Sequence, residues 1–208
     1  MIDLYTWSTP NGRKISIMLE ECALPYRVHA IDIGRGDQFT PEFVAISPNS
    51  KIPAIVDQEG PEGKPLALFE SGAILLYLSW KTDQFLPRGV VEQFEVIQWL
   101  MFQMGGVGPM FGQTHHFLRS APEPVPYAIE RYSKETRRLY GVLNSRLEGR
   151  EFLGSEYSVA DIATYPWVAR YDWHKVDLND FPAVKNWFDR IGRRPPVQVG
   201  MSVPQIRK

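Results

Sequence analysis

The chain has 208 residues, of which 44% are hydrophobic and 23% charged, values that are ordinary for a globular protein of one large or two small domains. A formal net charge of −1, without a long run of Lys or Arg, argues against a nucleic-acid partner. The N-terminus lacks the pattern of a signal peptide, and the densest apolar run, Ala73 to Leu78, is too short to span a bilayer. The single cysteine, Cys22, excludes an internal disulfide, a CxxC pair and a cysteine-based zinc cluster. We therefore expect a cytoplasmic protein with no membrane partner.

Residues 1–82 alternate between strand and helix patterns. Period-2 alternation predicts strands, and apolar residues at i, i+3, i+4 and i+7 predict a helical stripe that begins at Ile15. The predicted elements are, in chain order, strand 2–7, a helix after the turn 8–12 with its apolar stripe from Ile15 to Cys22, strand 26–31, a helix that begins at Thr40-Pro41, strands 54–56 and 66–69 around the turn 59–63, and helix 71–80. The order βαβαββα predicts parallel pairing through the strand–helix–strand units and an antiparallel hairpin at the end.

The rest of the chain has no convincing strand pattern. Residues 83–90 have the composition of a linker, and residues 91–208 are predicted to form an all-helical domain. The predicted helices are 90–104, 127–147, one that begins at the capping box 158–161, and one that follows 181–182 and stops at Pro195-Pro196, with breaks at 105–109 and 122–126. The predicted fold class is therefore α/β plus all-α.

Two short motifs stand at the ends of predicted strands. Ile52-Pro53 opens the strand 54–56, where proline is tolerated because it has no N–H to donate, and where an X-Pro bond can be cis. Glu70-Ser71 follows the strand 66–69 and starts a helix, where unpaired N–H groups favour a bound carboxylate. Each motif also has a purely structural interpretation, as a turn or as helix capping. Together they match the back half of a thioredoxin-like glutathione site.

A βαβαββα domain followed by an all-helical one, with these motifs so placed, resembles the cytosolic glutathione transferase family over essentially the whole chain. The stretches 8–12, 112–117 and 126–132 further resemble the bacterial nu class of that family, whose members are glutathione-dependent disulfide-bond oxidoreductases. The resemblance implies an N-terminal thioredoxin-like domain, glutathione as co-substrate, no metal, a small disulfide or electrophile as second substrate, and a homodimer.

The resemblance also implies roles for individual residues. Thr9 and Asn11 would flank the sulfur of glutathione as the catalytic residues. Ile52, before a cis Pro53, would pair through its backbone with the cysteinyl part of the tripeptide. The other implied glutathione-binding residues are Glu70 for the ammonium, Ser71 for the γ-glutamyl carboxylate, Gln38 and Lys51 for the glycyl end, and Arg131 from the helical domain.

These residue types suit thiol chemistry. Disulfide exchange needs a thiolate, and a free thiol of pKa about 8.5 is only a few per cent ionised at neutral pH. Lowering that pKa by roughly two units requires about 2.7 kcal/mol of preference for the anion. Hydrogen bonds to a charged group contribute about 1.5–3 kcal/mol each, so donors at Thr9 and Asn11 suffice, helped by the positive end of the following helix. No protein thiol is required, since Thr9-Pro10-Asn11-Gly12 stands where a glutaredoxin-like site has Cys-Pro-x-Cys.

The residues alone leave alternatives open. Ser8 is a second candidate for the hydroxyl at the sulfur, and Thr9 and Asn11 also suit a plain turn. Cys22 lies on the apolar stripe and is predicted to be a buried small hydrophobe. His115-His116 are adjacent, so from a helix they do not face one metal ion, and a place in a second-substrate pocket or on the surface is favoured.

Three functions are consistent with these features. The preferred one is a glutathione-dependent disulfide-bond oxidoreductase that uses the thiolate of bound glutathione. A second is conjugation, in which the same thiolate attacks an electrophilic carbon. A third is a non-catalytic regulatory module with the glutathione transferase fold.

Overall fold

The structure, a computed structural model, describes residues 1–205. These residues form two compact units, one of Met1–Gln84 with the segment that begins at Arg194, the other of Phe85–Arg193. The sequence pattern groups everything from residue 91 onward in the helical domain, whereas packing groups the segment from Arg194 with the first unit. In the described part of the chain, no helix is both long and apolar enough to cross a membrane.

The first unit is built on a four-stranded sheet in the order β2-β1-β3-β4. Its strands are β1 (Ile2–Thr6), β2 (Tyr26–Ala30), β3 (Ala54–Asp57) and β4 (Leu66–Phe69). β1 pairs with β2 in parallel, and the β1–β3 and β3–β4 pairs are antiparallel. The predicted order of elements along the chain, the parallel pairing of the first strand–helix–strand unit and the antiparallel hairpin are confirmed. The parallel pairing predicted for the second strand–helix–strand unit is wrong, because β3 pairs antiparallel with β1.

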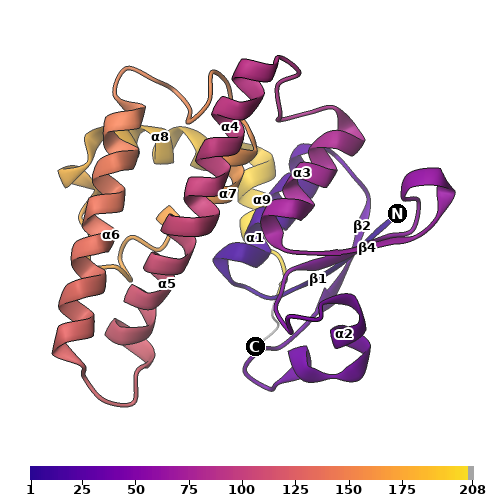
Figure 1. The fold of residues 1–208 in the computed structure, drawn as a ribbon, viewed down its shortest axis with the longest axis horizontal. Helices are drawn as coiled ribbons and strands as arrows, with labels where there is room; N and C mark the ends of the chain where they lie inside the picture. The colour runs from indigo at the N-terminus through magenta and orange to yellow at the C-terminus, as the bar shows by residue number, and fades with distance from the viewer. Residues whose placement is uncertain (206–208) are drawn as a thin grey trace. The chain divides into compact units, whose positions relative to one another are not determined.

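The first three helices of the first unit contact β1, β3 or β4, and the last packs on the first of them. They are α1 (Pro10–Glu21), α2 (Pro41–Ile46), α3 (Ser71–Thr82) and α9 (Pro195–Met201). α1 packs against both α3 and α9, and α2 contacts β3 and β4 (Figure 1). The apolar stripe predicted for α1 is confirmed, because Ile15, Met18 and Leu19 are fully buried.

The prolines at 195–196 play a different part from the one predicted. We expected them to stop the last helix, and α8 does end just before them, but they also begin α9. Proline suits the first positions of a helix because the missing N–H would have no partner there. α9 lies so close to α1 that a Cβ on Gly200 would come within 2.5 Å of the Cα of Ile17. The hydroxyl of Ser16 donates to the carbonyl of Gly200 at 2.6 Å.

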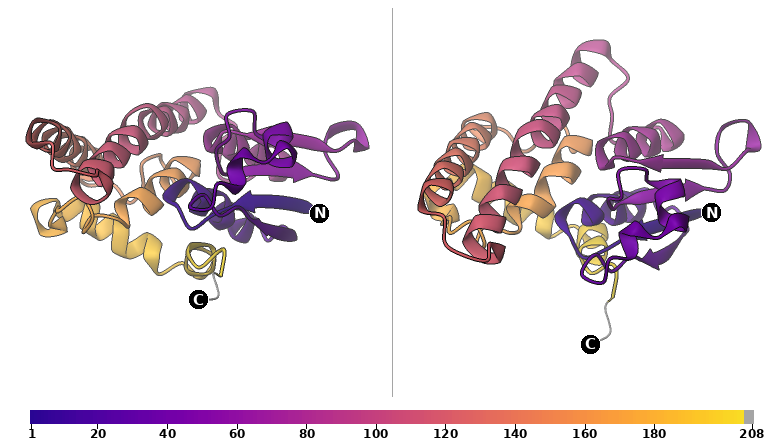
Figure 2. Two further views of the ribbon diagram at one scale, coloured as in Figure 1. Left: turned by 90° about the horizontal axis from the view of Figure 1, so that it is seen from below. Right: turned by 60° about the horizontal axis from the view of Figure 1, so that its bottom comes forward.

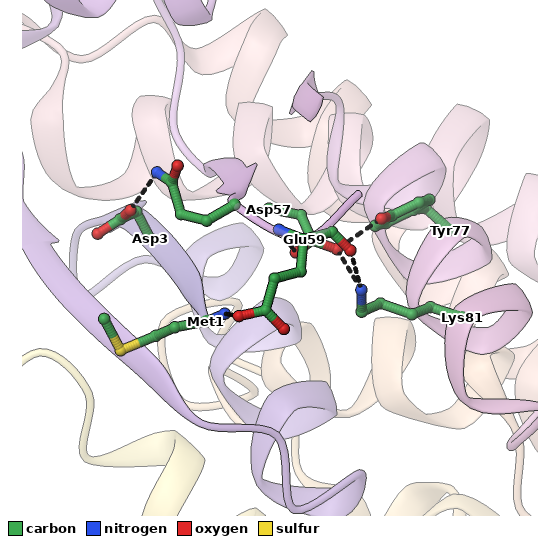
Figure 3. Close-up of polar contacts among 7 residues, drawn as sticks. Met1, Asp3, Asp57, Glu59, Tyr77 and Lys81 are labelled. Atoms are coloured by element: carbon green, nitrogen blue, oxygen red, sulfur yellow. Dashed lines mark hydrogen bonds and ion pairs between the residues drawn. The ribbon is translucent and has the colours of Figure 1, made fainter. Parts of the chain in front are cut away.

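A polar network occupies the end of the sheet where β1 begins (Figure 3). Asp57 is buried, accepts a hydrogen bond from the Tyr77 hydroxyl at 2.6 Å and lies 2.7 Å from the Lys81 ammonium. Burial alone would raise the pKa of Asp57, but hydrogen bonds from Lys81 and Tyr77 outweigh burial and lower it. Asp3 accepts from the Gln58 amide at 2.7 Å. These carboxylates are therefore held by partners at this end of the sheet.

The regular secondary structure of the second unit, Phe85–Arg193, is all helical. They are α4 (Val90–Phe102), α5 (Gly108–His115), α6 (Pro126–Leu147), α7 (Val159–Val168) and α8 (Pro182–Gly192). The glycine-rich stretch was predicted to bend or interrupt the first of them; instead it forms a wider π-helical turn, Gln103–Val107, through which the helix continues from α4 into α5. α4 and α5 consequently run on as one long rod, with α6 beside α5 (Figures 1 and 2).

The predicted capping box at the start of α7 is confirmed and anchors the second unit. Asp161 is fully buried and accepts from the backbone N–H of Ser158 at 3.0 Å and from its hydroxyl at 3.1 Å. The same carboxylate accepts from the N–H of Leu153 at 2.9 Å and from the indole N–H of Trp187 at 2.8 Å. Burial raises the pKa of Asp161 to about 6, against the lowering effect of these donors. One carboxylate thus joins α7, α8 and the loop before α7.

Replacing Asp161 by alanine is expected to lower the free energy of unfolding by about 3–5 kcal/mol, because it leaves several buried donors without an acceptor. Chemical denaturation at pH 8, followed by tryptophan fluorescence and by circular dichroism, measures the change. Asp189→Ala is the matched control, since Asp189 is half exposed and forms a surface ion pair with Lys185 across one helical turn. Its expected effect is within about 0.5 kcal/mol. Equal effects of the two substitutions would contradict the anchoring role.

Candidate functional site

The hydrogen-bonded register brings three chain segments to one edge of the sheet. Tyr5 in β1 lies opposite Ala54 in β3, and Ala54 lies opposite Phe69 in β4. Because antiparallel neighbours run in opposite directions, the chain leaves β1, enters β3 and leaves β4 at this same edge. The segments found there are the turn 8–12, Ile52-Pro53 and Glu70-Ser71. The edge lies opposite the polar network of Figure 3.

Thr9 caps the helix that follows β1. Its backbone is extended, and its side-chain oxygen accepts from the N–H of Gly12 at 3.2 Å, while Pro10 takes the first helical position. With one lone pair engaged in this way, the hydroxyl still has a hydrogen with which to bind an anion. Asn11, half-buried, lies in the first turn, where the unpaired N–H groups and the helix dipole favour negative charge.

The segment before β3 presents its backbone at the same edge. The Ile52–Pro53 bond is cis, as expected, and Pro53 is buried. The buried hydroxyl of Ser47 donates to the carbonyl of Lys51 at 2.8 Å and so fixes the approach to the proline. Lys51 itself is exposed. Gln38 lies in the short turn Asp37–Phe39, and its buried side-chain oxygen has no hydrogen-bond partner among residues 1–205, so that oxygen can accept from a ligand N–H.

Glu70 and Ser71 form the junction between β4 and α3. Glu70 has φ 70° and ψ 110°, a backbone conformation that is strained for a residue with a Cβ. Such a conformation destabilises the folded state by about 1–3 kcal/mol and is found most often at functional sites. The Glu70 side chain is exposed, so the carboxylate can accept a hydrogen bond from the ammonium of a ligand. Ser71 is the first residue of α3 and is only 4% exposed. Its hydroxyl and the helix N-terminus are placed to bind a carboxylate.

Lys14 is a charged residue of this region that the sequence reasoning missed. It lies on α1, is 1% exposed, and its ammonium donates to the Ser71 hydroxyl at 3.2 Å. Burial lowers the pKa of Lys14 to about 7, and the charge of Glu70 acts in the opposite direction. The available signal was its spacing, because Lys14 precedes Met18 by four residues and so shares the buried face of the helix.

Cys22 lies far from this edge. It caps the other end of α1, is 9% exposed, and its sulfur lies 3.5 Å from the Thr82 hydroxyl. Cys22 lies thirteen positions after Thr9 in mostly helical chain, a distance of about 20 Å along the axis. Burial raises the pKa of the Cys22 thiol. The only cysteine of the chain is therefore a buried thiol, as predicted. Ser8, the competing hydroxyl, is half-buried in the same turn as Thr9.

Arg131 belongs to the second unit. It is exposed on α6 and lines a pocket of about 640 Å³ between α5 and α6. Other lining residues include Tyr127 and Glu130. Arg138, also at this pocket, donates two hydrogen bonds of 2.7 Å to Glu135, and they lower the pKa of that carboxyl. The pocket therefore presents a cation, Arg131, beside an ion pair.

His115 and His116 face different neighbours. The ring of His115 stacks on that of His174 with centroids 4.4 Å apart, whereas His116 meets Phe117 edge-on. Burial lowers the pKa of His115 to about 4, and Arg170 adds to the effect. Within residues 1–205, no group of three His, Cys, Asp or Glu side chains gathers in a way that could hold a metal ion.

Comparison with protein families identifies both halves of the chain. Residues 9–79 match the family described as glutathione S-transferase, N-terminal domain. Residues 109–195 match the family described as glutathione S-transferase, C-terminal domain. The first match contains the turn 8–12 from Thr9 onward and both motifs at the sheet edge, and the second contains the capping box.

One curated relative and two solved structures are similar over nearly the whole chain. Disulfide-bond oxidoreductase YfcG of Escherichia coli (strain K12) is 57% identical over 197 residues, which cover 94% of this chain and 92% of that protein. A glutathione transferase from Pseudomonas putida, solved with one glutathione disulfide bound per subunit, has a TM-score of 0.94 at 45% identity and covers 98% of this chain and 91% of its own.

The second structure is a glutathione transferase from Burkholderia graminis, solved with two glutathione molecules bound per subunit. It has a TM-score of 0.94 at 48% identity, over 99% of this chain and 89% of its own. The fold, the two family matches and these identities lead to one conclusion: this chain belongs to the glutathione S-transferase family.

Proposed function

We propose that this protein is a glutathione-dependent disulfide-bond oxidoreductase of the nu-class type, whose nucleophile is the thiolate of bound glutathione. The position of the single cysteine carries the proposal. Cys22 is buried at the far end of α1, while the turn at the sheet edge offers Thr9 and Asn11 and no sulfur. The reactive sulfur of a disulfide exchange at this edge would therefore arrive with the ligand.

The remaining contacts follow the tripeptide along the edge. The backbone of Ile52 pairs with the cysteinyl part, Glu70 accepts the γ-glutamyl ammonium, and Ser71 donates to the γ-glutamyl carboxylate. Gln38 and Lys51 bind the glycyl end. Arg131 of the helical unit reaches the tripeptide, either in the same subunit or from a partner subunit. Residues 1–82 thus form the glutathione-binding domain, 83–90 the linker and 91–208 the helical domain, with the reservation that α9 packs on α1.

The reaction proceeds in two exchanges. The bound glutathione thiolate attacks one sulfur of a small disulfide, forms a mixed disulfide with it and releases the other half as a thiolate, which takes a proton from water. A second glutathione thiolate then attacks the glutathione sulfur of the mixed disulfide. Glutathione disulfide forms, and the second half of the substrate leaves as a thiol. Hydrogen bonds from Thr9 and Asn11 stabilise the first thiolate.

Three relatives support this assignment. The 57% identical Escherichia coli protein is named a disulfide-bond oxidoreductase. The Pseudomonas putida structure contains glutathione disulfide, and the Burkholderia graminis structure contains two glutathione molecules per subunit. The two exchanges together consume two glutathione molecules and produce one glutathione disulfide. A cytoplasmic location fits as well, since that compartment maintains reduced thiols and the protein carries no disulfide.

Conjugation of an electrophile is the second candidate function, because the same thiolate could attack an electrophilic carbon. Parallel assays with a small disulfide and an aryl halide decide between the two. The proposal requires the disulfide to be the better substrate by kcat/KM. A non-catalytic regulatory module would show neither activity.

Asn11→Ala is expected to lower kcat/KM for disulfide reduction by roughly 10–100-fold, because it removes one hydrogen bond to a thiolate. It should also raise the pKa of bound glutathione, which the ultraviolet absorbance of the thiolate measures. Thr9→Val and Ser8→Ala, compared in the same assay, decide which hydroxyl serves the sulfur. The matched control is Cys22→Ala, for which we expect unchanged kcat. Full activity in Asn11→Ala, or its loss in Cys22→Ala, would contradict the proposal.

We further propose a homodimer. Large apolar side chains stand exposed on α4, where Val90, Val91 and Phe94 are 70%, 79% and 61% accessible, and on the first unit, where Phe39 is 68% accessible. Large apolar side chains exposed near one another on one helix, as on α4, are typical of an interaction site. The pairing expected from the family joins the first domain of one subunit to the helical domain of the other.

Light scattering after size exclusion should give about twice the 23.9 kDa of one chain. Phe94→Glu places a charge in the apolar surface of α4 and is expected to shift the protein towards monomer. Val199→Glu is the control, because Val199 is an exposed apolar residue, 48% accessible, on α9. A wild-type mass of one chain would refute the dimer.

A further inference from the structure

The feature that the proposed reaction does not use is the buried ammonium of Lys14. It is one of the few charged side chains in the core of the first unit, at 1% exposure, and it lies against the first residue of α3. Its ammonium donates to the Ser71 oxygen at 3.2 Å. Taking a lysine out of water is costly, so a buried lysine in contact with a binding residue calls for a functional explanation.

We infer that Lys14 is the positioning cation of the carboxylate subsite at Ser71, so that a ligand with an α-carboxylate binds there together with a proton. The inference rests on the proposed glutathione site and assigns a role to a residue outside it. Lys14 acts through Ser71, because its ammonium supplies a hydrogen bond to the oxygen whose hydroxyl faces the ligand.

Distance supports an electrostatic effect. A carboxylate that accepts from the Ser71 hydroxyl lies at most about two hydrogen-bond lengths, roughly 6 Å, from the ammonium that donates to the same oxygen. An opposite charge within about 4–6 Å strongly favours the charged form of a group. The N-terminus of α3 binds the anion whatever the state of Lys14, but the ammonium adds a full positive charge behind it.

The other charged groups near α1 do not take over this role. Of the elements packed on α1, α9 has no titratable side chain. β1 brings Asp3, which is held by His29 and Gln58 at the opposite end of the sheet, and Tyr5, whose ring stacks on His29 and whose pKa is raised by burial, so that it stays neutral. α3 brings Tyr77 and Lys81, both bound to Asp57 there (Figure 3). The charge that acts on Lys14 is that of Glu70.

In the proposed complex, Glu70 is engaged by the ligand ammonium. The ligand ammonium then balances the negative charge of Glu70. The ligand carboxylate becomes the negative charge that acts most strongly on Lys14. The zwitterionic head of a γ-glutamyl group therefore brings an ammonium to the exposed Glu70 and a carboxylate to the buried Lys14–Ser71 pair. A ligand that lacks the carboxylate would bring no negative charge to Lys14 and is expected to leave its pKa unchanged.

The sign of the pH dependence follows. The pKa of Lys14 in the free protein is about 7, so at pH 7.5 about three-quarters of the molecules have a neutral Lys14. A bound carboxylate raises that pKa, and binding then takes up a proton. Affinity is highest below pH 7 and falls as the pH rises from about 7 to the higher pKa of the complex. Each rise of one in that pKa corresponds to about tenfold weaker binding at the high-pH limit.

The test is calorimetric titration of the wild-type protein with S-methylglutathione, which has no titrating thiol, at pH 7.5 in buffers of different ionisation enthalpy. We expect uptake of about half a proton or more per ligand bound. Lys14→Met, nearly isosteric and uncharged, should bind at least tenfold more weakly at pH 6.5 and take up no proton. The surface control Lys64→Met, whose side chain is 78% exposed, should match the wild type.

A second ligand makes the test independent of any variant. The S-methyl tripeptide with 4-aminobutanoate in place of γ-glutamate keeps the amine and lacks only the α-carboxylate, so its binding to wild type should take up no proton. In turnover, Lys14→Met should raise KM for glutathione with little change in kcat.

The outcomes separate the two proposals. Binding of S-methylglutathione without proton uptake, or equal uptake by Lys14→Met, overturns the role of Lys14 and leaves the glutathione site intact. The absence of any binding by the wild-type protein overturns the proposed function, and the inference with it.

Discussion

The pairing of β1, β3 and β4 constrains everything else in the first unit. Tyr5, Ala54 and Phe69 lie side by side across three strands, so the exit of β1, the entry to β3 and the exit of β4 share one edge of the sheet. A slip of one residue in either pair would turn every side chain of a strand to the other face, exposing Leu4 or Ile55, both of which are fully buried. The core therefore fixes the register, and the register places Thr9, Pro53 and Ser71 together.

At this edge of the sheet, the hydroxyl oxygens of Thr9 and Ser71 each accept a hydrogen bond from another group of the protein. The Thr9 oxygen accepts from the N–H of Gly12, and the Ser71 oxygen accepts from Lys14. Each donor fixes the rotation of a side chain that would otherwise turn freely, and each polarises the hydroxyl toward donation. The two hydroxyls lie at the starts of α1 and α3, where the positive ends of the helix dipoles also favour a bound anion. The edge is consequently suited to a ligand with two anionic groups.

The order of elements in the first unit follows from local sequence patterns, so it could be predicted from the sequence alone. Period-2 strands, the stripe from Ile15 and the capping box at Ser158 involve residues close together in sequence, so the sequence predicted them and the structure confirms them. The cis bond before Pro53 was likewise expected from its place at a strand entry. The roles of the glutathione-binding residues came from a family resemblance, and they stay predictions.

The features that the sequence did not predict depend on contacts between segments that are far apart in the sequence. The Lys14–Ser71 contact joins residues 57 positions apart. The spacing of Lys14 from Met18 places it on the buried face of α1, but it does not identify Ser71 as its partner. α9 was missed because Pro195-Pro196 reads equally well as a helix stop and as a helix start, and only the close approach of Gly200 to Ile17 decides. The strained backbone of Glu70 is visible only in three dimensions.

The contact between α9 and α1 also bears on how the protein is made. The first unit consists of two pieces of chain with the whole of Phe85–Arg193 between them. Synthesis runs from the N-terminus, and domains generally fold as units while the chain emerges from the ribosome. The second unit has all its parts as soon as Arg193 has emerged, whereas the first must wait for α9 before the surface of α1 around Ile17 is covered. The half of the molecule that is translated first is thus the last to be completed.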